Sequence, residues 1–531
     1  MNCKNTKKLT FLDSTLRDGA QAQGMSFSVR DKLEIVKALD RFGVDFIEAG
    51  APFAGPKEVQ FFEQAKQLKL KNSQLVAFGS TRRKSIAAQD DESLQALANA
   101  GTSWVAVFGK ASVLQVEKIL ETDKQTNLSM IFDTVEFLKQ SGKKVIFDAE
   151  HFFDGYIADR AYAAECLNAA ANAGADKIVL CDTNGATFPM QIDEIVKQLF
   201  EQNPDLYKKT AEWGIHTHND RGMAEANSLT AVGNGITHIQ GTFLGFGERC
   251  GNAKLATIIP DLLLCMGYDG KCRANLARLT ETARKIAEIS NISIKRNEPY
   301  IGVAAFAHKA GTHSNAVLKL PQSFEHIDPR SVGNERRTLT SELSGTSVIL
   351  EKIKKSHPGT KITENAAEKL KTTLKQMEAD GYQFEGAEAS FDMLMRSVLG
   401  LQTDFFTVPA YTITDTLQQS GTATAQAEVC VSVGGRSKSI TAAGNGPVNA
   451  FDTALRQALE AFYPALRKMH LIDYKVRVID GGMATGSQVR VLVSSTDGEN
   501  VWSTVGVSPD VIEASKIALI DSLNYYLAYF A

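Results

Sequence analysis

The stretch Ile215–Gly222, which reads IHTHNDRG, decides how this chain can be organised. Side chains alternate between the two faces of an extended strand, so His216 and His218 point to the same side, where both imidazoles can hold one ion. In an arbitrary His-x-His pair, the histidines are more often hydrogen-bonded structural residues. The polar and small residues after them are typical of the end of a strand, where barrels and open sheets place their chemistry, and they favour a metal site.

Length and composition indicate a globular enzyme-sized protein. The 531 residues are enough for about three domains of ~150 residues each. The net charge of -3 offers no broad attraction for nucleic acid or an anionic membrane, so neither is expected as a partner. No apolar run approaches the ~20 residues of a membrane span, and Met1–Lys8 does not lead into a signal peptide. A cytoplasmic location is therefore expected.

The number and spacing of the cysteines also indicate a cytoplasmic location. There are seven of them, an odd number, and no two are spaced as a Cys-x-x-Cys pair. This pattern predicts free thiols in a reducing compartment, with neither a disulfide framework nor a zinc clip.

From residue 9 to about residue 266, short apolar runs alternate with longer amphipathic stretches, which is the pattern of repeated strand-helix units. Eight units in this length fit a closed (β/α)8 TIM barrel better than an open doubly wound sheet, and no Gly-x-Gly-x-x-Gly follows the first strand. The expected strands are Leu9–Asp13, Asp45–Ala49, Gln74–Phe78, Trp104–Phe108, Lys144–Asp148, Lys177–Cys181, Glu212–Thr217 and His238–Thr242.

The segment after the first strand shows the helical half of the pattern. Ser28 can cap a helix, and Leu33, Val36, Leu39 and Phe42 recur on one face at helical spacing. This face is expected to pack against the sheet.

Beyond the barrel, two further parts are expected. We assign residues 1–275 to a catalytic TIM-barrel domain, 276–400 to a helical linker or lid subdomain, and 401–531 to a C-terminal α+β domain. The last part carries an internal repeat, because Val429–Val431 and the helix that follows are echoed 62 residues later by Val491–Val493 and another helix. A duplicated module without its own His/Asp/Glu cluster is more typical of a ligand-sensing or dimerising domain than of a second active site.

The C-terminal ends of barrel strands converge on one cleft, so polar residues there can be considered together. Their number predicts a heavily charged mouth. The residues are Asp13, Arg17 and Asp18 at the end of the first strand, Asp148, Glu150 and His151 at the fifth, Asp182, Thr183 and Asn184 at the sixth, the two histidines at the seventh, and Glu248, Arg249 and Asn252 after the eighth.

Two imidazoles and one carboxylate form an open site for a divalent metal, because the substrate can complete the shell. We choose Asp18 as the carboxylate. Arg17 beside it would place a cation where an oxyanion develops, or it could brace the loop as an ion pair with Asp13 or Glu48. Thr183 could donate to a substrate carboxylate or serve as a turn former.

Two stretches resemble the signatures of the 2-isopropylmalate/homocitrate/citramalate synthase family. They are Leu16–Gln21 (LRDGAQ), with Lys32 following, and the segment from Trp213 to Ala224. The duplicated C-terminal module resembles the allosteric dimerisation domain of this family. Within the family, Phe147–Tyr156 and Ser341–Gly345 look most like the citramalate synthases.

The resemblance implies an acyltransferase that joins acetyl-CoA to a 2-oxo acid, pyruvate in this subgroup, and releases citramalate and CoA in isoleucine biosynthesis. It implies that Asp18, His216 and His218 bind the metal, with Asn252 in or near the shell. Manganese, zinc, cobalt and magnesium all suit this set, so the metal is left open. A homodimer inhibited by a branched-chain amino acid, isoleucine in this subgroup, is also implied.

The resemblance further assigns roles to side chains that do not bind the metal. Arg17 would stabilise the alkoxide, Glu150 and Thr183 would orient the substrate, and His308 would deprotonate the acetyl methyl group. One departure concerns Phe324, which stands where a tyrosine is often found in the family. The phenol has been assigned a part in proton transfer, so water or another residue would carry that step here.

Three alternatives remain open at this point. The first is a 2-isopropylmalate synthase that uses 3-methyl-2-oxobutanoate. The second is a lyase of the hydroxymethylglutaryl-CoA type, which is weakened because its Gly-Gly-Cys loop is absent and Cys250 follows Arg249 instead. The third is a metal- and amino-acid-binding sensor without turnover.

Overall fold

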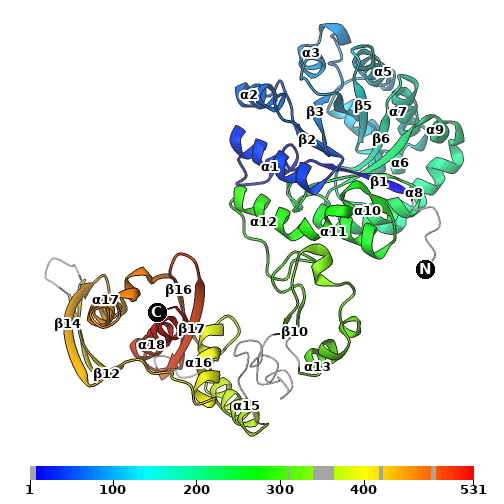
Figure 1. Ribbon diagram of the computed structural model, residues 1–531. Coiled ribbons are helices and arrows are strands. Elements are labelled where there is room, and N and C mark those ends of the chain that lie inside the picture. Colours follow the sequence, from blue (N-terminus) through cyan, green and yellow to red (C-terminus); the bar gives the residue numbers. More distant parts are fainter. Residues whose placement is uncertain (1–6, 309–310, 339–363, 418–422, 480–485, 531) are drawn as a thin grey trace. The chain divides into compact units, whose positions relative to one another are not determined.

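The computed structural model describes residues 7–308, 311–338, 364–417, 423–479 and 486–530 (Figure 1). Its chain divides into two compact units. The first contains Met1–Phe306 and His326–Arg336, and the second contains Ala307–Glu325 and Arg337–Ala531. The motif Ser341–Gly345 lies outside the described residues.

The first unit is a closed parallel barrel, as predicted. Its eight strands pair in chain order, and β1 pairs with both β8 and β2, which closes the ring. All eight predicted strands are present, and three of them, β3, β4 and β5, run two residues further than expected. The strands are β1 (Lys8–Asp13), β2 (Phe46–Gly50), β3 (Gln74–Ser80), β4 (Trp104–Lys110), β5 (Lys144–Glu150), β6 (Lys177–Asp182), β7 (Glu212–Thr217) and β8 (His238–Gly241).

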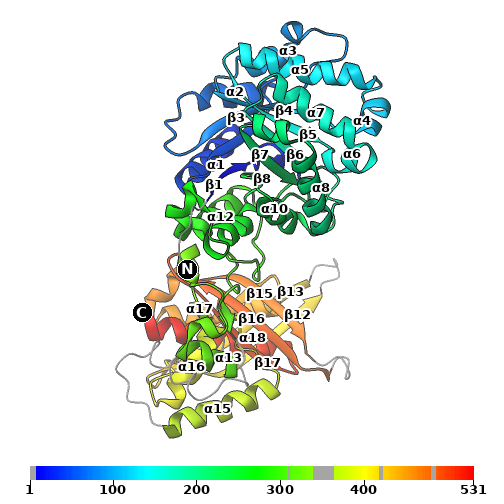
Figure 2. The same ribbon diagram turned by 90° about the vertical axis from the view of Figure 1, so that its right-hand side faces the viewer.

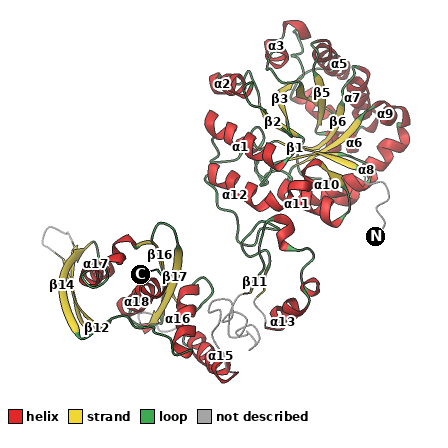
Figure 3. Ribbon diagram, in the orientation of Figure 1, coloured by secondary structure: helices red, strands yellow, loops and turns green. Residues whose placement is uncertain are grey.

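Helices surround these strands, which lie at the centre of the unit (Figure 3). They are α1 (Val29–Phe42), α2 (Pro56–Ala65), α3 (Glu92–Ala98), α4 (Val113–Lys118), α5 (Lys124–Gln140), α6 (Phe152–Ala158), α7 (Arg160–Asn172), α8 (Pro189–Gln202), α9 (Pro204–Lys209), α10 (Ala224–Gly233), α11 (Leu255–Pro260) and α12 (Leu279–Ile289). A two-residue strand, β9 (Asp269–Gly270), pairs with the start of β1.

The first helix begins where the sequence places its cap. The Ser28 side chain accepts a hydrogen bond from the Asp31 amide, and the Asp31 carboxylate accepts one from the Ser28 amide, which is a complete capping box. Val36, Leu39 and Phe42 are buried as predicted. Leu33 is only half-buried, and Lys32 is buried instead because its ammonium group bonds to Glu58.

The inward side chains change character along the barrel axis. Near the middle they form an apolar cluster of Leu12, Phe46, Val76, Ala106, Ile146, Val179 and Cys181. Glu48 lies two residues after Phe46, and Asp148 lies two residues after Ile146, so both side chains also point into the barrel. Both are buried. The barrel is therefore a packed core that ends in a polar layer.

The second unit begins with a short parallel pair, β10 (Ala307–His308) and β11 (Arg337–Thr338). Its helices before the C-terminal module are α13 (Gly311–Lys319), α15 (Glu364–Ala379) and α16 (Glu388–Val398). A small apolar core joins α15 and α16 to one of the sheets that follow.

The C-terminal module is duplicated, as the sequence repeat predicts. Each copy is a three-stranded antiparallel sheet followed by one helix. The helices lie between the two sheets (Figure 1), and Figure 2 labels all strands of the second sheet beside its helix. The first copy is β12 (Thr407–Leu417), β13 (Ala423–Val433), β14 (Arg436–Gly444) and α17 (Pro447–Glu460), and the second is β15 (His470–Val478), β16 (Val489–Thr496), β17 (Val501–Ser508) and α18 (Val511–Tyr529).

Both copies contribute to one hydrophobic core, because inward residues of β13 and β16 pack with both helices. Among the helices that the structure describes, none is long and apolar enough to cross a membrane.

Candidate active site and metal centre

The barrel brings together the three residues chosen as metal ligands. His216 lies near the end of β7, His218 follows the strand, and Asp18 comes from the loop after β1. The Nε2 atom of His216 lies 3.2 Å from Nε2 of His218 and 3.4 Å from Oδ2 of Asp18. The distance from Nε2 of His218 to Oδ2 of Asp18 is 3.8 Å. All three side chains are buried. Three ligand atoms thus converge at one point, as an ion would require.

The hydrogen bonds around His216 orient its ring for a metal. Gln240 on β8 donates its amide Nε2 to Asp148 Oδ1 at 2.9 Å, so its Oε1 faces His216 Nδ1 at 2.9 Å as an acceptor. The proton of a neutral imidazole is then on Nδ1, and the Nε2 lone pair faces Asp18 and His218. Sequence reasoning missed Gln240, although its inward position on the neighbouring strand is a signal that could have found it.

Asn252 lies where its side-chain oxygen could serve as a fourth protein ligand to a metal. Its amide Nδ2 is 3.2 Å from His216 Nε2, and its buried Oδ1 has no hydrogen-bond partner among the described residues. A half-turn of the amide exchanges the two atoms and brings that oxygen toward the ligand cluster. The donor set of two imidazoles, one carboxylate and a nearby amide oxygen therefore fits a divalent metal with open positions.

Arg17 is held on three sides. Its Nε donates to Glu48 Oε2 at 2.6 Å, its Nη1 donates to Asp18 Oδ2 at 3.1 Å, and its guanidinium stacks 3.8 Å above the Phe78 ring. Of the two partners considered from the sequence, Glu48 makes the ion pair and Asp13 does not. The bracing role and the oxyanion role are compatible, because Nη2 has no partner within the part of the chain that is described.

The charges of the triad depend on one another. Burial alone would raise the pKa of Asp18, but the Arg17 cation and the hydrogen bond with His216 hold it far below its usual value. Burial, then the neighbouring His216, lowers the pKa of His218 to about 3. Burial alone would lower the pKa of His216 as well, yet contact with Asp18 leaves it raised. At neutral pH, Asp18 is thus ionised and His218 is neutral, and any proton on His216 Nε2 must leave before that nitrogen can bind a metal.

Two further carboxyl groups titrate close to neutrality. Burial raises the pKa of Asp13 to about 7, partly offset by hydrogen bonds with Thr15. Burial and the neighbouring Glu48 raise the pKa of Asp148 to about 7. The layer beneath the ligands therefore carries less negative charge at pH 7 than its sequence suggests.

Glu150 and Thr183, the predicted substrate-orienting residues, lie at the ends of β5 and β6. The Glu150 carboxylate forms an ion pair with Lys110, the last residue of β4, which sequence reasoning missed because the strand was expected to end two residues earlier. Thr183 Oγ1 accepts a hydrogen bond from the His151 amide at 2.8 Å. Its own hydroxyl proton is therefore left to donate to a ligand.

Arg249 ties the loops after β6, β7 and β8 together. Its Nη2 lies 2.8 Å from the Thr183 carbonyl, 2.9 Å from Asp220 Oδ2 and 3.0 Å from His218 Nδ1. Gly251 makes this loop possible, because its φ is +88° and a Cβ there would lie 2.1 Å from the Gly245 carbonyl oxygen. The loop thus sets the position of Asn252, the neighbouring candidate ligand.

His308, the predicted base, belongs to the second unit. It lies in β10, and its Nε2 is 3.1 Å from Glu325 Oε1. Phe324 is half exposed, with its ring centroid 4.3 Å from that of His313. The role of His308 stays a prediction.

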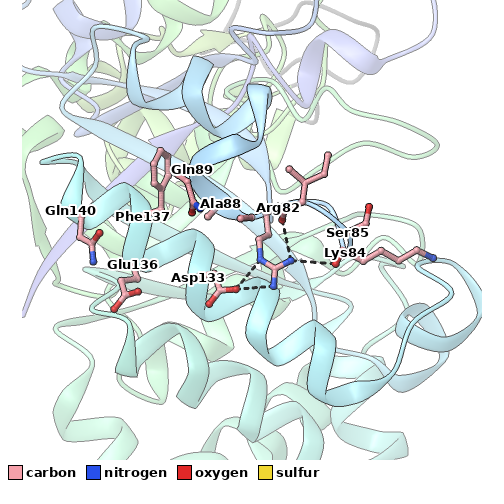
Figure 4. A pocket seen from close by; sticks show the side chains of 11 residues that line it. Arg82, Lys84, Ser85, Ala88, Gln89, Asp133, Glu136, Phe137 and Gln140 are labelled. Atoms are coloured by element: carbon pink, nitrogen blue, oxygen red, sulfur yellow. Dashed lines mark hydrogen bonds and ion pairs between the residues drawn. The ribbon is translucent and has the colours of Figure 1, made fainter.

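A pocket of about 480 Å³ lies on the barrel away from the triad, between the loop after β3 and α5. Figure 4 shows the Arg82 side chain reaching Asp133, and their Nε–Oδ2 distance is 2.9 Å. Arg82 also donates to backbone carbonyls of its own loop, so its charge is already compensated. The pocket contains none of the predicted site residues.

Comparisons with known families cover most of the chain. The HMGL-like family profile matches residues 8–286, and a homocitrate synthase post-HMGL domain-like profile matches residues 300–381. The profile of the LeuA allosteric (dimerisation) domain matches residues 385–527. These matches follow the order barrel, helical segment and duplicated module.

Individual relatives are similar over nearly the whole chain. The (R)-citramalate synthase of Aquifex aeolicus (strain VF5) is 47% identical over 524 residues, 98% of each protein. The (R)-citramalate synthase of Synechocystis sp. is 46% identical, covering 98% of this chain and 97% of the relative. A probable 2-isopropylmalate synthase of Methanopyrus kandleri is 30% identical, covering 97% and 98%. The resemblance predicted from the two motifs is confirmed, and the chain belongs to the HMGL-like family and, within it, to the group that the (R)-citramalate synthases form.

Proposed function

We propose that the barrel catalyses the condensation of acetyl-CoA with pyruvate to give citramalate and CoA, the reaction of a citramalate synthase. One observation carries this proposal. In a chain of this family, Asp18, His216 and His218 converge on one point with Arg17 fixed beside them. A buried ligand triad with an adjacent guanidinium suits a substrate that carries a carboxylate next to a ketone.

In this scheme, each residue of the mouth has a separate task. A divalent ion bound by Asp18, His216 and His218 would act as a Lewis acid toward the 2-oxo acid, with Asn252 completing the protein ligands. Arg17 directs its free N–H groups at the oxygen that becomes negative as the new bond forms.

Two more residues orient the substrate. Thr183 donates its hydroxyl to the substrate carboxylate. Glu150, paired with Lys110, limits how the substrate can lie between β4 and β6.

His308 is the proposed base. It removes a proton from the acetyl methyl group, and the resulting carbanion attacks the ketone carbon of pyruvate. The carbon-carbon bond forms as the C=O double bond becomes a single bond, and the alkoxide oxygen then takes up a proton to become the hydroxyl group of the product. Hydrolysis of the thioester then releases CoA. The carboxylate of Glu325, 3.1 Å from His308 Nε2, would stabilise the imidazolium that forms in the first step.

A substrate panel tests the reaction. Purified protein, supplied with a divalent metal, is expected to release free CoA from acetyl-CoA faster with pyruvate than with 3-methyl-2-oxobutanoate. Faster release with the branched oxo acid would overturn the assignment in favour of a 2-isopropylmalate synthase. No CoA release with any oxo acid, together with retained metal binding, would favour a sensor.

We also propose that the chain works in the cytoplasm as a homodimer in isoleucine biosynthesis. The division into 1–275, 276–400 and 401–531 then separates catalysis, a linking lid and regulation. Isoleucine is expected to inhibit CoA release more strongly than valine or leucine. Full inhibition after removal of residues 401–531 would contradict the regulatory role of this part.

A further inference from the structure

A lysine and a glutamate form an ion pair at the carboxyl end of β2, and no step of the proposed reaction uses them. Lys32 of α1 is only 2% exposed, and its ammonium group donates to both carboxylate oxygens of Glu58 on α2 at 2.7 Å each. The same nitrogen lies 4.8 Å from the ring centroid of Phe61. Burial of two charges is costly, and their attraction offsets this cost only when their geometry is good. Such a pair contributes little net stability, but it fixes the positions of the groups that touch it.

The ion pair touches the last residue of β2. Gly50 has φ +130°, and a Cβ atom there would lie 2.1 Å from Glu58 Oε2 and 2.9 Å from Lys32 Nζ. Only a residue without a side chain allows the two charged groups to come this close to the strand. The carboxylate and the ammonium group therefore pack directly against the backbone at the end of β2.

The strand changes its register at the same place. Glu48 of β2 pairs with Val76 of β3. Gly50, two residues later, pairs with Ala77, which is only one residue further along β3. Two residues against one is the count of a β-bulge, with Ala49 as the extra residue. A bulge redirects the side chains beside it and is common next to active sites, and here the side chain beside it is that of Glu48.

Glu48 in turn holds Arg17. The Glu48 side chain is fully buried, and its Oε2 accepts a hydrogen bond from Arg17 Nε at 2.6 Å. Arg17 Nη1 then lies 3.1 Å from Oδ2 of Asp18, one of the three candidate metal ligands. The second carboxylate oxygen of Glu48 has no hydrogen-bond partner among the described residues. The direction of the Glu48 side chain therefore depends on the backbone of β2.

We propose that Lys32 and Glu58 are positioning residues, which hold the bulge of β2 so that Glu48 keeps the Arg17 guanidinium beside the candidate metal ligands. The contacts run from the ion pair to Gly50, from the bulge to Glu48, and from the Glu48 carboxylate to Arg17. This inference rests on the proposed reaction, in which Arg17 stabilises the oxygen that becomes negative. It adds to that reaction two residues of the outer helices that do not touch the substrate.

Removal of the whole ion pair tests the positioning role. Lys32→Met/Glu58→Met removes both charges, so no unpaired buried charge remains. We expect kcat for CoA release to fall ~10–100-fold, since a misplacement of about 1 Å can cost this much in rate. The KM for pyruvate and the affinity for Mn²⁺ should change little, because Arg17 acts on charge that develops only during the reaction. Glu34→Met/Lys37→Met removes an exposed ion pair of the same helix and should leave kcat unchanged.

The same change in an Arg17→Lys protein separates positioning from a general loss of structure. If the ion pair acts through Arg17, adding Lys32→Met/Glu58→Met to Arg17→Lys should lower kcat no further. A further fall as large as the one in the wild-type protein would overturn the proposal. A folded Lys32→Met/Glu58→Met protein with the wild-type kcat would overturn it as well.

A measurement without turnover keeps this inference distinct from the proposed reaction. The Arg17 side chain is 15% exposed, and peptide mass spectrometry can follow its modification by phenylglyoxal. Lys32→Met/Glu58→Met should be modified faster than the wild type at Arg17 and equally fast at Arg467, which is exposed in the second unit. Equal rates at Arg17 would overturn the inference, whereas a wild type that releases no CoA with any 2-oxo acid would refute only the proposed reaction. If the double variant does not fold, Glu58→Gln, which keeps the side-chain shape, replaces it in each assay with the same expected results.

Discussion

His216 and Gln240 form a buried hydrogen bond of 2.9 Å between imidazole Nδ1 and amide Oε1, which selects the tautomer that can bind a metal. A second bond, from Gln240 Nε2 to Asp148 Oδ1, prevents the amide from turning round. We therefore expect the metal affinity of this candidate site to depend on a residue that is not itself a ligand.

Replacing Gln240 with leucine is expected to weaken metal binding ~10–100-fold, as is typical when a partner of a ligating histidine is lost. Isothermal titration of the apoprotein with Mn²⁺ or Zn²⁺ measures this. Gln140→Leu, an exposed change on α5, is the matched control and should bind normally. Unchanged affinity in a folded Gln240→Leu protein would contradict the orienting role.

Arg17→Lys keeps the positive charge but loses the planar fork that meets Glu48 and Asp18 together. CoA release with saturating pyruvate is expected to fall ~10²–10³-fold, the usual effect of losing one donor to a developing oxyanion. Arg83→Lys, in the exposed loop after β3, should retain wild-type rates. A near-normal kcat for Arg17→Lys would show that Arg17 only holds the loop in place.

Gly251→Ala should disturb Asn252 and the metal site. Alanine at φ +88° is strained, and its Cβ would lie 2.1 Å from the Gly245 carbonyl oxygen, so the loop must move. Gly24→Ala is the control for backbone strain without a steric clash, because Gly24 has φ +78° and no atom lies near the added Cβ. Metal titrations are expected to show weaker binding for the first variant only, and equal affinities would contradict this reading of the loop.

Asp521 should make the stability of the second unit depend on pH. Burial raises its pKa to about 7, although Ser390 donates a hydrogen bond to it. Because the folded pKa lies above the unfolded value near 3.8, folding favours the protonated form. Stability is therefore greatest at low pH and falls as the pH rises toward 7, by up to about 4 kcal/mol.

Asp521→Asn removes this titration and can still accept from Ser390. Urea denaturation at pH 5 and pH 8, followed by circular dichroism, measures the free energy of unfolding. This free energy should exceed the wild-type value in the variant by more at pH 8 than at pH 5. An equal difference at both values would show that the carboxyl group is ionised throughout.

Local pattern was sufficient to predict the barrel and the triad. Alternation over two residues places His216 and His218 on one face, and eight repeated units place Asp18 beside them once the ring closes. Neither step requires knowledge of a rotamer. The pairing of Arg17 with Phe78 could not be predicted in this way, because it depends on which inward side chain of β3 lies under the guanidinium.

The sequence by itself determined the strand order, the duplicated C-terminal module and the choice of Asp18, His216 and His218 as candidate ligands, since each follows from spacing along the chain. Only the tertiary structure decided that Gln240 meets His216 and that Lys110 meets Glu150. These relationships join side chains on different strands. Their distances follow from packing in three dimensions, which a pattern read along one chain does not contain.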